Sequence, residues 1–317
     1  MSKRRFFIAG LVAVGLVGAP AEAAPQFQLE IIGHLDGSYS SAQAVSNSGV
    51  VVGYAGTSAA SSLPRSAVAW TDGALAELGT LGGTRSTALG VNDTGAVVGW
   101  ARDSSEASQA MVYRDGTMTG LNGIAADPQW NLSTAWSVNN AGQVVGVATG
   151  PNGDRGFVLS LTDGSFTPLG TLGGSSSQAW DINNHGVITG WATDATGQRL
   201  AFVHDGETMT ALASLGDRSD QAYGINDMGW VVGQALDATG ASRAVLWVDG
   251  EVFDLNTLIL GADGWILDFA WGINDRGWIV GNARDAEGNL FGFVLTPIPE
   301  PGALPVLIAA LGLMLAM

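Results

Sequence analysis

The chain contains 317 residues with a formal net charge of -16, 46 glycines, no cysteine and only 13% charged residues. The absence of cysteine excludes disulfides, thiolate zinc sites and cysteine nucleophiles, and the acidic balance disfavours binding to nucleic acid or to anionic lipid. Abundant glycine and sparse charge suit short strands joined by tight turns, so the composition predicts an all-β protein and excludes a helical bundle.

The first 23 residues have the three-part layout of a secretory signal peptide. Three basic residues at 3–5 precede an apolar run over 6–17, and the small residues Ala21 and Ala23 match the positions that signal peptidase recognises. An uncleaved membrane anchor is the alternative, but the apolar run is short for a hydrocarbon layer about 30 Å thick. We therefore expect an exported protein that loses residues 1–23 to signal peptidase after general or twin-arginine export.

Between residues 24 and 296 one sequence unit recurs six times. Each copy has a conspicuous alanine, a turn that contains Asn, Asp or Ser and ends in glycine, and an apolar stretch that ends in a second glycine. The turn glycines lie 43 to 48 residues apart, at Gly49, Gly95, Gly142, Gly186, Gly229 and Gly277. A period of this length is typical of a repeat architecture.

Every complete copy predicts four short strands. The first two strands flank the Asn-Asp-x-Gly turn, in which the polar side chains cap the turn and glycine adopts a positive φ. The third and fourth strands flank an Asp-Gly pair, which is a strong hairpin signal. This pair occurs at Asp72-Gly73, Asp115-Gly116, Asp163-Gly164, Asp205-Gly206 and Asp249-Gly250.

The two ends of the repeat region complement each other. The sixth copy stops at Thr296 after its third strand, whereas residues 27–35 form an extra strand whose end, 32–35, matches the fourth-strand end at 78–81. The extra strand can therefore supply the missing one, which predicts a six-bladed β-propeller of four-stranded blades closed by the N-terminal strand. An open solenoid is the alternative, but it needs polar capping repeats that neither end supplies.

Several repeat motifs resemble a known family. Leu-Gly-Thr-Leu-Gly-Gly over 78–83 and 169–174, the Asn-x-x-Gly-x-Val-Val-Gly turn, and Ala-Phe-Val over 201–203 are similar to the HAF-repeat family of extracellular repeat proteins. The histidine that begins the family triplet is replaced in all six copies. The resemblance implies an exported protein and carries no catalytic residue.

The last 21 residues, 297–317, form a second distinct segment. Pro299, Glu300, Pro301 and Gly302 lead into an apolar stretch over 303–317. This layout resembles a PEP-CTERM sorting signal, although the family's terminal arginine cluster is missing. The resemblance implies processing by exosortase, transient anchoring of 303–317 in the inner membrane, and delivery to the surface or matrix of a bacterium with an outer membrane.

A catalytic site should break the repeat, because it needs one set of unlike groups. The three histidines occupy different repeat positions, so they do not predict a metal cage, and no Gly-x-Ser-x-Gly elbow is present. The Asn-Asp pairs fit turn capping better than calcium binding. We therefore expect no metal, no cofactor and no catalysis. The alternative is a polysaccharide hydrolase or lyase at the channel mouth, using Asp217, Arg218 and Asp220.

Aromatic residues divide into two sets. Trp136, Trp180, Tyr223 and Trp271 share the repeat position beside the constant alanine, which indicates packing between blades. Trp130 and Trp265 instead lie in the longer loops between fourth and first strands.

These two loops belong to one predicted face of the propeller, where binding sites are usual. Arg85, Arg218 and Asp220 should border the same face, and aromatic rings with polar neighbours suit sugar rings. The hypothesis is a noncatalytic structural, adhesive or saccharide-binding module whose partner is exopolysaccharide or another surface glycan. The alternative is that Trp130 and Trp265 cover the core.

Overall fold

The computed structural model describes residues 27–32, 39–56, 65–71, 74–125, 127–261 and 264–298. In this part of the chain the only helices are two single 3-10 turns, η1 (Leu121–Gly123) and η2 (Leu255–Thr257), which confirms the predicted all-β class. None of its helices is long and apolar enough to cross a membrane. The predicted cleavage residues, Ala21 and Ala23, and the sorting segment from Pro299 to Met317 lie outside the described residues.

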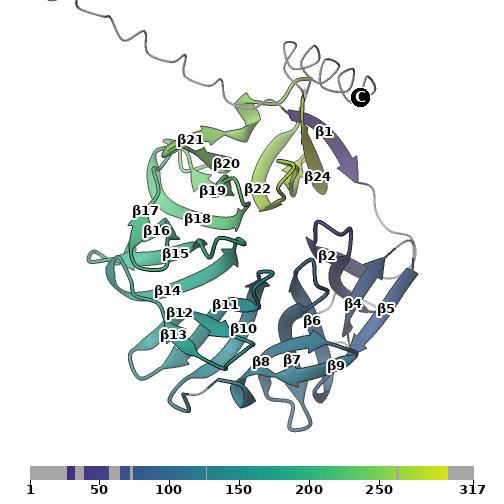
Figure 1. Cartoon of the computed structure of the whole chain (residues 1–317). Helices are drawn as coiled ribbons and strands as arrows, with labels where there is room; N and C mark the ends of the chain where they lie inside the picture. The colour runs from purple at the N-terminus through teal and green to yellow at the C-terminus, as the bar shows by residue number, and fades with distance from the viewer. Residues whose placement is uncertain are drawn as a thin grey trace, which may run out of the picture.

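The described strands form six units of four antiparallel strands that follow one another around a common centre (Figure 1). Four of these units are separate sheets, whereas the first two units are joined into one eight-stranded sheet. Unit 1 contains β2 (Tyr39–Val45), β3 (Val51–Gly56), β4 (Arg65–Thr71) and β5 (Ala74–Gly79). Unit 2 contains β6 (Gly82–Val91), β7 (Val97–Asp103), β8 (Ser108–Arg114) and β9 (Thr117–Gly120). Unit 3 contains β10 (Asn131–Val138), β11 (Gln143–Gly150), β12 (Gly153–Ser160) and β13 (Phe166–Pro168).

The second half of the chain continues the same order. Unit 4 contains β14 (Gly173–Ile182), β15 (Ile188–Asp194), β16 (Arg199–His204) and β17 (Met209–Ala211). Unit 5 contains β18 (Asp217–Ile225), β19 (Val231–Leu236), β20 (Ser242–Val248) and β21 (Glu251–Asp254). Unit 6 contains β22 (Ile266–Ile273), β23 (Ile279–Arg284), β24 (Leu290–Pro297) and, from the start of the repeat region, β1 (Phe27–Ile32).

The position of β1 joins the two ends of the repeat region. It pairs antiparallel with β24, from Phe27 opposite Pro297 to Ile32 opposite Gly292. The strand that the sixth copy lacks is therefore supplied by residues that precede the first copy, as the sequence predicts. In Figure 1, unit 6 is followed around the centre by unit 1.

The repeated glycines follow from two local requirements. In the turn of unit 2, Gly95 adopts a φ of 85° and donates its N–H to the Asn92 carbonyl, which is a geometry that favours glycine. Further along, a Cβ on Gly99 would lie 2.0 Å from the Thr87 carbonyl oxygen, because β6 bulges between Ala88 and Gly90. The apolar stretch after each turn therefore ends in glycine for a steric reason.

Neighbouring units pack through small residues. The constant alanine is fully buried in units 2 to 6, and the third strand of the preceding unit brings a small residue against it. In units 3 and 4, a Cβ on Gly156 would lie 2.9 Å from the Ala179 nitrogen. Hydrogen bonds from the Ala67 and Gly156 N–H groups to the hydroxyls of Ser86 and Ser177 also join adjacent units. Close backbone approach therefore fixes each unit on the next.

Candidate functional site

Six polar side chains, one from each unit, form a set that we call the axial turn ring. Each belongs to the turn between the first and second strands of its unit. The members are Asn47, Asp93, Asn140, Asn184, Asp227 and Asp275. They are joined to one another rather than to their own turns, so this ring connects the units around the centre of the molecule.

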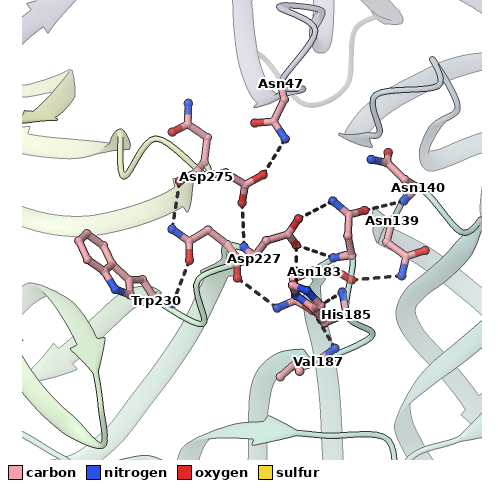
Figure 2. A network of polar contacts seen from close by, with 12 residues as sticks. Asn47, Asn139, Asn140, Asn183, His185, Val187, Asp227, Trp230 and Asp275 are labelled. Carbon is pink, nitrogen blue, oxygen red and sulfur yellow. Dashed lines mark hydrogen bonds and ion pairs between the residues drawn. The ribbon is translucent and has the colours of Figure 1, made fainter. Parts of the chain in front are cut away.

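Asp227 shows the bonding pattern of the axial turn ring (Figure 2). Its carboxylate accepts the Asn184 backbone N–H at 2.7 Å and the Asn184 side-chain amide at 2.9 Å. Its own N–H donates to Asp275 Oδ1 at 2.7 Å. Asn47 bonds to the units on both sides of unit 1. Its Nδ2 donates to Asp275 Oδ2 of unit 6 at 2.8 Å, and its backbone N–H donates to Asp93 Oδ1 of unit 2 at 2.7 Å. One hydrogen bond between side chains therefore links unit 6 to unit 1.

A second set of bonds runs beside the ring. The asparagine ladder comprises Asn92, Asn139, Asn183, Asn226 and Asn274. The first four donate a side-chain N–H to the backbone carbonyl of the next member at 2.9 to 3.1 Å. Unit 1 has Ser46 at this position, and a serine has no amide with which to continue the ladder. The side-chain bond that would run from unit 1 to Asn92 of unit 2 is therefore missing.

The pKa values of two carboxyl groups near the centre are shifted in opposite directions. Burial opposes ionisation of Asp93, but hydrogen bonds from Asn140 and Asn47 outweigh it and hold its pKa below the ordinary value. Burial raises the pKa of Asp181 from 3.8 to about 6, although the carboxylate accepts the N–H groups of Ile182 and Ile225 at 2.9 Å. Asp93 is therefore ionised at neutral pH, and Asp181 is protonated more readily than an ordinary aspartate.

The aromatic residues beside the constant alanine contact one another from unit to unit. Ring centroids are 4.5 Å apart for Trp136 and Trp180, 5.0 Å for Trp180 and Tyr223, and 4.6 Å for Tyr223 and Trp271. Units 1 and 2 have Gln43 and Leu89 at this position. The aromatic arc therefore spans units 3 to 6, as predicted from its repeat position, and its rings are used for packing.

Trp130 and Trp265 are both half-buried against the cores of their own units. The ring of Trp130 lies on Gly150 with its centroid 5.9 Å from that of Phe166. The ring of Trp265 is edge-on to Phe291 at 5.2 Å. They belong to units 3 and 6 and are not brought together, so each would contribute to a separate surface.

The polar residues predicted for the same face are also distributed. Arg85 lies in β6 of unit 2, whereas Arg218 and Asp220 lie in β18 of unit 5. Asp220 is buried, and the side chains of Asp217 and Arg218 lie outside the described part of the structure. Asp268 occupies the repeat position of Asp220 in the next unit, so this aspartate is shared by two copies. The structure does not gather the predicted residues into one site.

Arg85 instead belongs to a compact group at the junction of units 1 and 2. We define this arginine cluster as Tyr54, Arg65, Arg85, Thr87, Trp100 and Arg102. A parallel bridge places Arg65 of β4 opposite Arg85 of β6 and joins the strands of the two units into one sheet. The Arg65 guanidinium lies 4.3 Å from the centre of the Tyr54 ring and 5.2 Å from that of Trp100. Thr87 lies opposite Trp100 on the adjacent strand.

The arginine cluster contains three positive charges, and within the part of the chain that the structure describes only Arg102 forms an ion pair. Arg102 forms an ion pair with Glu106 at 3.1 Å, and the Glu106 carboxylate also accepts the N–H and hydroxyl of Thr84 at 2.9 Å. Arg85 is only 8% exposed, and burial together with the charges of Arg65 and Arg102 lowers its guanidinium pKa. In the described residues, neither Arg65 nor Arg85 has an ion-pair or hydrogen-bond partner for its side chain.

Sequence reasoning identified Arg85 but missed Arg65. The two are 20 positions apart and meet only because β4 and β6 of different units run side by side. The available signal was an arginine in each of these strands, and the sequence does not show that the two strands are in contact. Over the described ranges, no group of three or more His, Asp or Glu residues is placed to hold a metal ion.

The strand pairing and the axial turn ring together define an all-β repeat protein built from four-stranded antiparallel units. The family model described as "Protein of unknown function (DUF3466)" matches residues 82–284, which is more than half of the chain. The chain belongs to this family. A search of the curated proteins finds no match.

The family match corrects the resemblances drawn from short motifs. The matching family is DUF3466 and not the HAF-repeat family, and no finding supports a PEP-CTERM signal. The physical reason lies in the turns. The Asn-x-x-Gly turn and the glycine after the valine pair are required by hairpin geometry and by the bulge at Gly99, so similar motifs can arise in unrelated repeats.

The solved structures that align with this chain have little sequence identity to it. The acylaminoacyl peptidase of Pyrococcus horikoshii has a TM-score of 0.50 at 11% identity, covering 83% of this chain and 46% of that one. AofleA from Arthrobotrys oligospora has a TM-score of 0.46 at 12% identity, covering 88% and 91%. A mutant of Trypanosoma rangeli sialidase displaying trans-sialidase activity has a TM-score of 0.45 at 11% identity, covering 90% and 56%. The likeness to the peptidase concerns the fold alone.

Proposed function

We propose that this chain is an exported, noncatalytic six-bladed β-propeller, closed by β1, that acts as a saccharide-binding or adhesive module. The blades are units 1 to 6. Pairing of β1 with β24 and the hydrogen bond from Asn47 to Asp275 both support closure between unit 6 and unit 1. Export rests on the predicted leader, 1–23.

The axial turn ring is the observation that supports a noncatalytic role most directly. Catalysis by carboxylates needs groups that are free to bind substrate or to exchange protons. The three aspartates of the ring instead accept hydrogen bonds from the adjacent unit, including the backbone N–H groups of Asn47, Asn184 and Asp227. These central carboxylates therefore act as connectors between blades, and recognition falls to the opposite ends of the strands.

Retention on immobilised polysaccharides tests this proposal. The exported full-length protein is applied to neutral and acidic polysaccharides, and release of reducing ends or unsaturated sugars is followed in the same samples. We expect retention on at least one polysaccharide without product release. Failure to bind any of them contradicts the binding role, and sustained product release contradicts the noncatalytic role in favour of a hydrolase or lyase.

Intact-mass measurement of the exported protein tests the export component separately. Loss of residues 1–23 is the expected result, since Ala21 and Ala23 match the requirements of signal peptidase. Recovery of the chain only inside the cytoplasm, with its leader intact, would contradict export.

A further inference from the structure

The arginine cluster contains buried polar groups that the protein itself does not satisfy. Arg65 Nε, Arg85 Nε and Thr87 Oγ1 are buried without a hydrogen-bond partner among the described residues. Most buried polar groups in proteins are paired, and leaving one unpaired is unfavourable because the group has lost its hydrogen bonds to water. Three such atoms in one junction between units indicate that a further hydrogen-bonding group belongs there.

The charge of that group follows from its surroundings. The charge of Glu106 partly offsets that of Arg85, but its carboxylate is bonded to Arg102 and Thr84 and forms no ion pair with Arg65 or Arg85. Two adjacent guanidiniums repel each other and together favour an anion, even though the whole chain carries a formal charge of -16. Guanidinium groups match the planar, two-oxygen geometry of a carboxylate.

The flanking residues distinguish this site from a simple anion site. Tyr54 and Trp100 place aromatic rings beside Arg65, and Thr87 adds a hydroxyl that can both donate and accept. Aromatic surfaces together with a few convergent polar groups are typical of sites for organic ligands. The geometry points to a binding site for a carboxylated sugar, of the uronic acid class, between units 1 and 2.

This inference rests on the proposed saccharide-binding function and specifies its ligand. The carboxylate is assigned to Arg65 and Arg85, and the sugar ring to the surface formed by Tyr54, Trp100 and Thr87. The assignment requires no catalytic step, because every contact is a hydrogen bond, an ion pair or an aromatic contact.

Unit 4 offers a matched control for this site. Arg199 has the repeat position of Arg65 and lies 4.4 Å from the ring of Trp191, but the position of Arg85 in the following unit, unit 5, is occupied by Ser219. Arg199→Met therefore removes an equivalent arginine and its aromatic contact without affecting a pair of arginines. It controls for the loss of one positive charge.

Calorimetric titration of the full-length protein with trigalacturonate tests the inference. Arg85→Met should weaken binding at least about tenfold, since one charge-assisted hydrogen bond contributes roughly 1.5 to 3 kcal/mol, whereas Arg199→Met should leave it within about twofold of the unmodified protein. Thr87→Val, which keeps the shape of the side chain, should weaken binding by about three- to tenfold. Equal affinity in all four proteins would overturn the site.

Two ligand controls need no substitution and so do not depend on how the variants fold. The methyl ester of trigalacturonate should bind the unmodified protein at least about tenfold more weakly than the free acid, because it lacks the charge. Sodium sulfate or acetate that binds as tightly as trigalacturonate would overturn the sugar assignment. If the protein binds a polysaccharide but does not distinguish acid from ester, the inference fails while the proposed function stands; if it binds no polysaccharide, the proposed function itself fails.

Discussion

Arginines near the junctions between units have acidic partners in one region of the described structure, whereas two arginines in another region form no ion pair. In units 5 and 6, Arg243 pairs with Asp237 at 2.8 Å, and Arg284 pairs with the buried Asp268 at 2.6 Å. In units 1 and 2, Arg65 lies over aromatic rings and opposite Arg85, and neither arginine forms an ion pair among the described residues. Arginines therefore form internal ion pairs in units 5 and 6, whereas in units 1 and 2 Arg65 and Arg85 are available for the proposed ligand.

Removing a paired arginine should have the largest effect on stability. Arg284→Ala leaves the Asp268 carboxylate, which is 5% exposed, without its cation. Breaking a buried pair in this way costs about 3 to 5 kcal/mol, and we expect about 2 to 3 here because Arg284 is partly exposed. Urea unfolding measures the change, with Arg114→Ala at an exposed position as the control. A loss no greater than that of the control would remove the distinction between the two regions.

The axial turn ring holds both regions in place, so breaking it should have the next largest effect. Asp275→Ala removes the acceptor for the Asp227 N–H and for the Asn47 amide. We expect a loss of about 1 to 2 kcal/mol in the free energy of unfolding.

Asp275→Asn is the control for that change, since it keeps one acceptor oxygen and should lose less than half as much. Equal losses in the two variants would show that the carboxylate oxygens do not carry the link between unit 6 and unit 1. Both values come from the same urea unfolding experiment.

The pH dependence of stability should distinguish Asp181 from the ionised aspartates of the ring. Its pKa is raised from 3.8 to about 6, so the folded protein binds more protons than the unfolded chain between these values. Protonated Asp181 therefore stabilises the folded state fully below about pH 4, and this contribution is lost as the pH rises through about 6. Asp181→Ser adopts the residue found at the same repeat position in unit 3, Ser137.

We expect the unfolding free energy of the unmodified protein to fall by about 1 to 2 kcal/mol more than that of Asp181→Ser between pH 4 and pH 7. Urea unfolding at the two pH values measures this difference, in which the remaining titrating groups largely cancel. Parallel pH profiles would contradict the raised pKa of Asp181.

Removing an unpaired arginine should have the smallest effect on stability. Arg85→Met replaces a buried cation that has no acidic partner with an apolar side chain of similar length. Since an uncompensated buried charge is unfavourable, we expect a change of less than about 0.5 kcal/mol, or a gain. A loss as large as that of Arg284→Ala would show that Arg85 is a structural residue with an internal role.

The repeat pattern was sufficient to predict much of the fold. The turn glycines, the hairpins and the pairing of residues 27–32 with the last copy follow from local geometry and from the phase of the copies. The polar turn residues were predicted to cap their own turns. Asn92 does so, because its Oδ1 accepts the Ala96 N–H, but Asp93 bonds to the neighbouring units instead.

The site was less predictable, because it depends on contacts between units. The sequence does not show whether a loop tryptophan is exposed or covers the core. In the structure, Trp130 and Trp265 pack against their own units. Arg65 and Arg85 become neighbours only through the contact of β4 with β6. Such contacts are set by the packing of whole units, which the spacing of motifs within one copy does not determine.

A crystal structure of the full-length protein with trigalacturonate tests the central claim most directly. The account predicts a sugar carboxylate between units 1 and 2, with its oxygens about 3 Å from guanidinium nitrogens of both Arg65 and Arg85. A structure in which the ligand lies elsewhere, and in which protein groups or water alone satisfy both arginines, would contradict it.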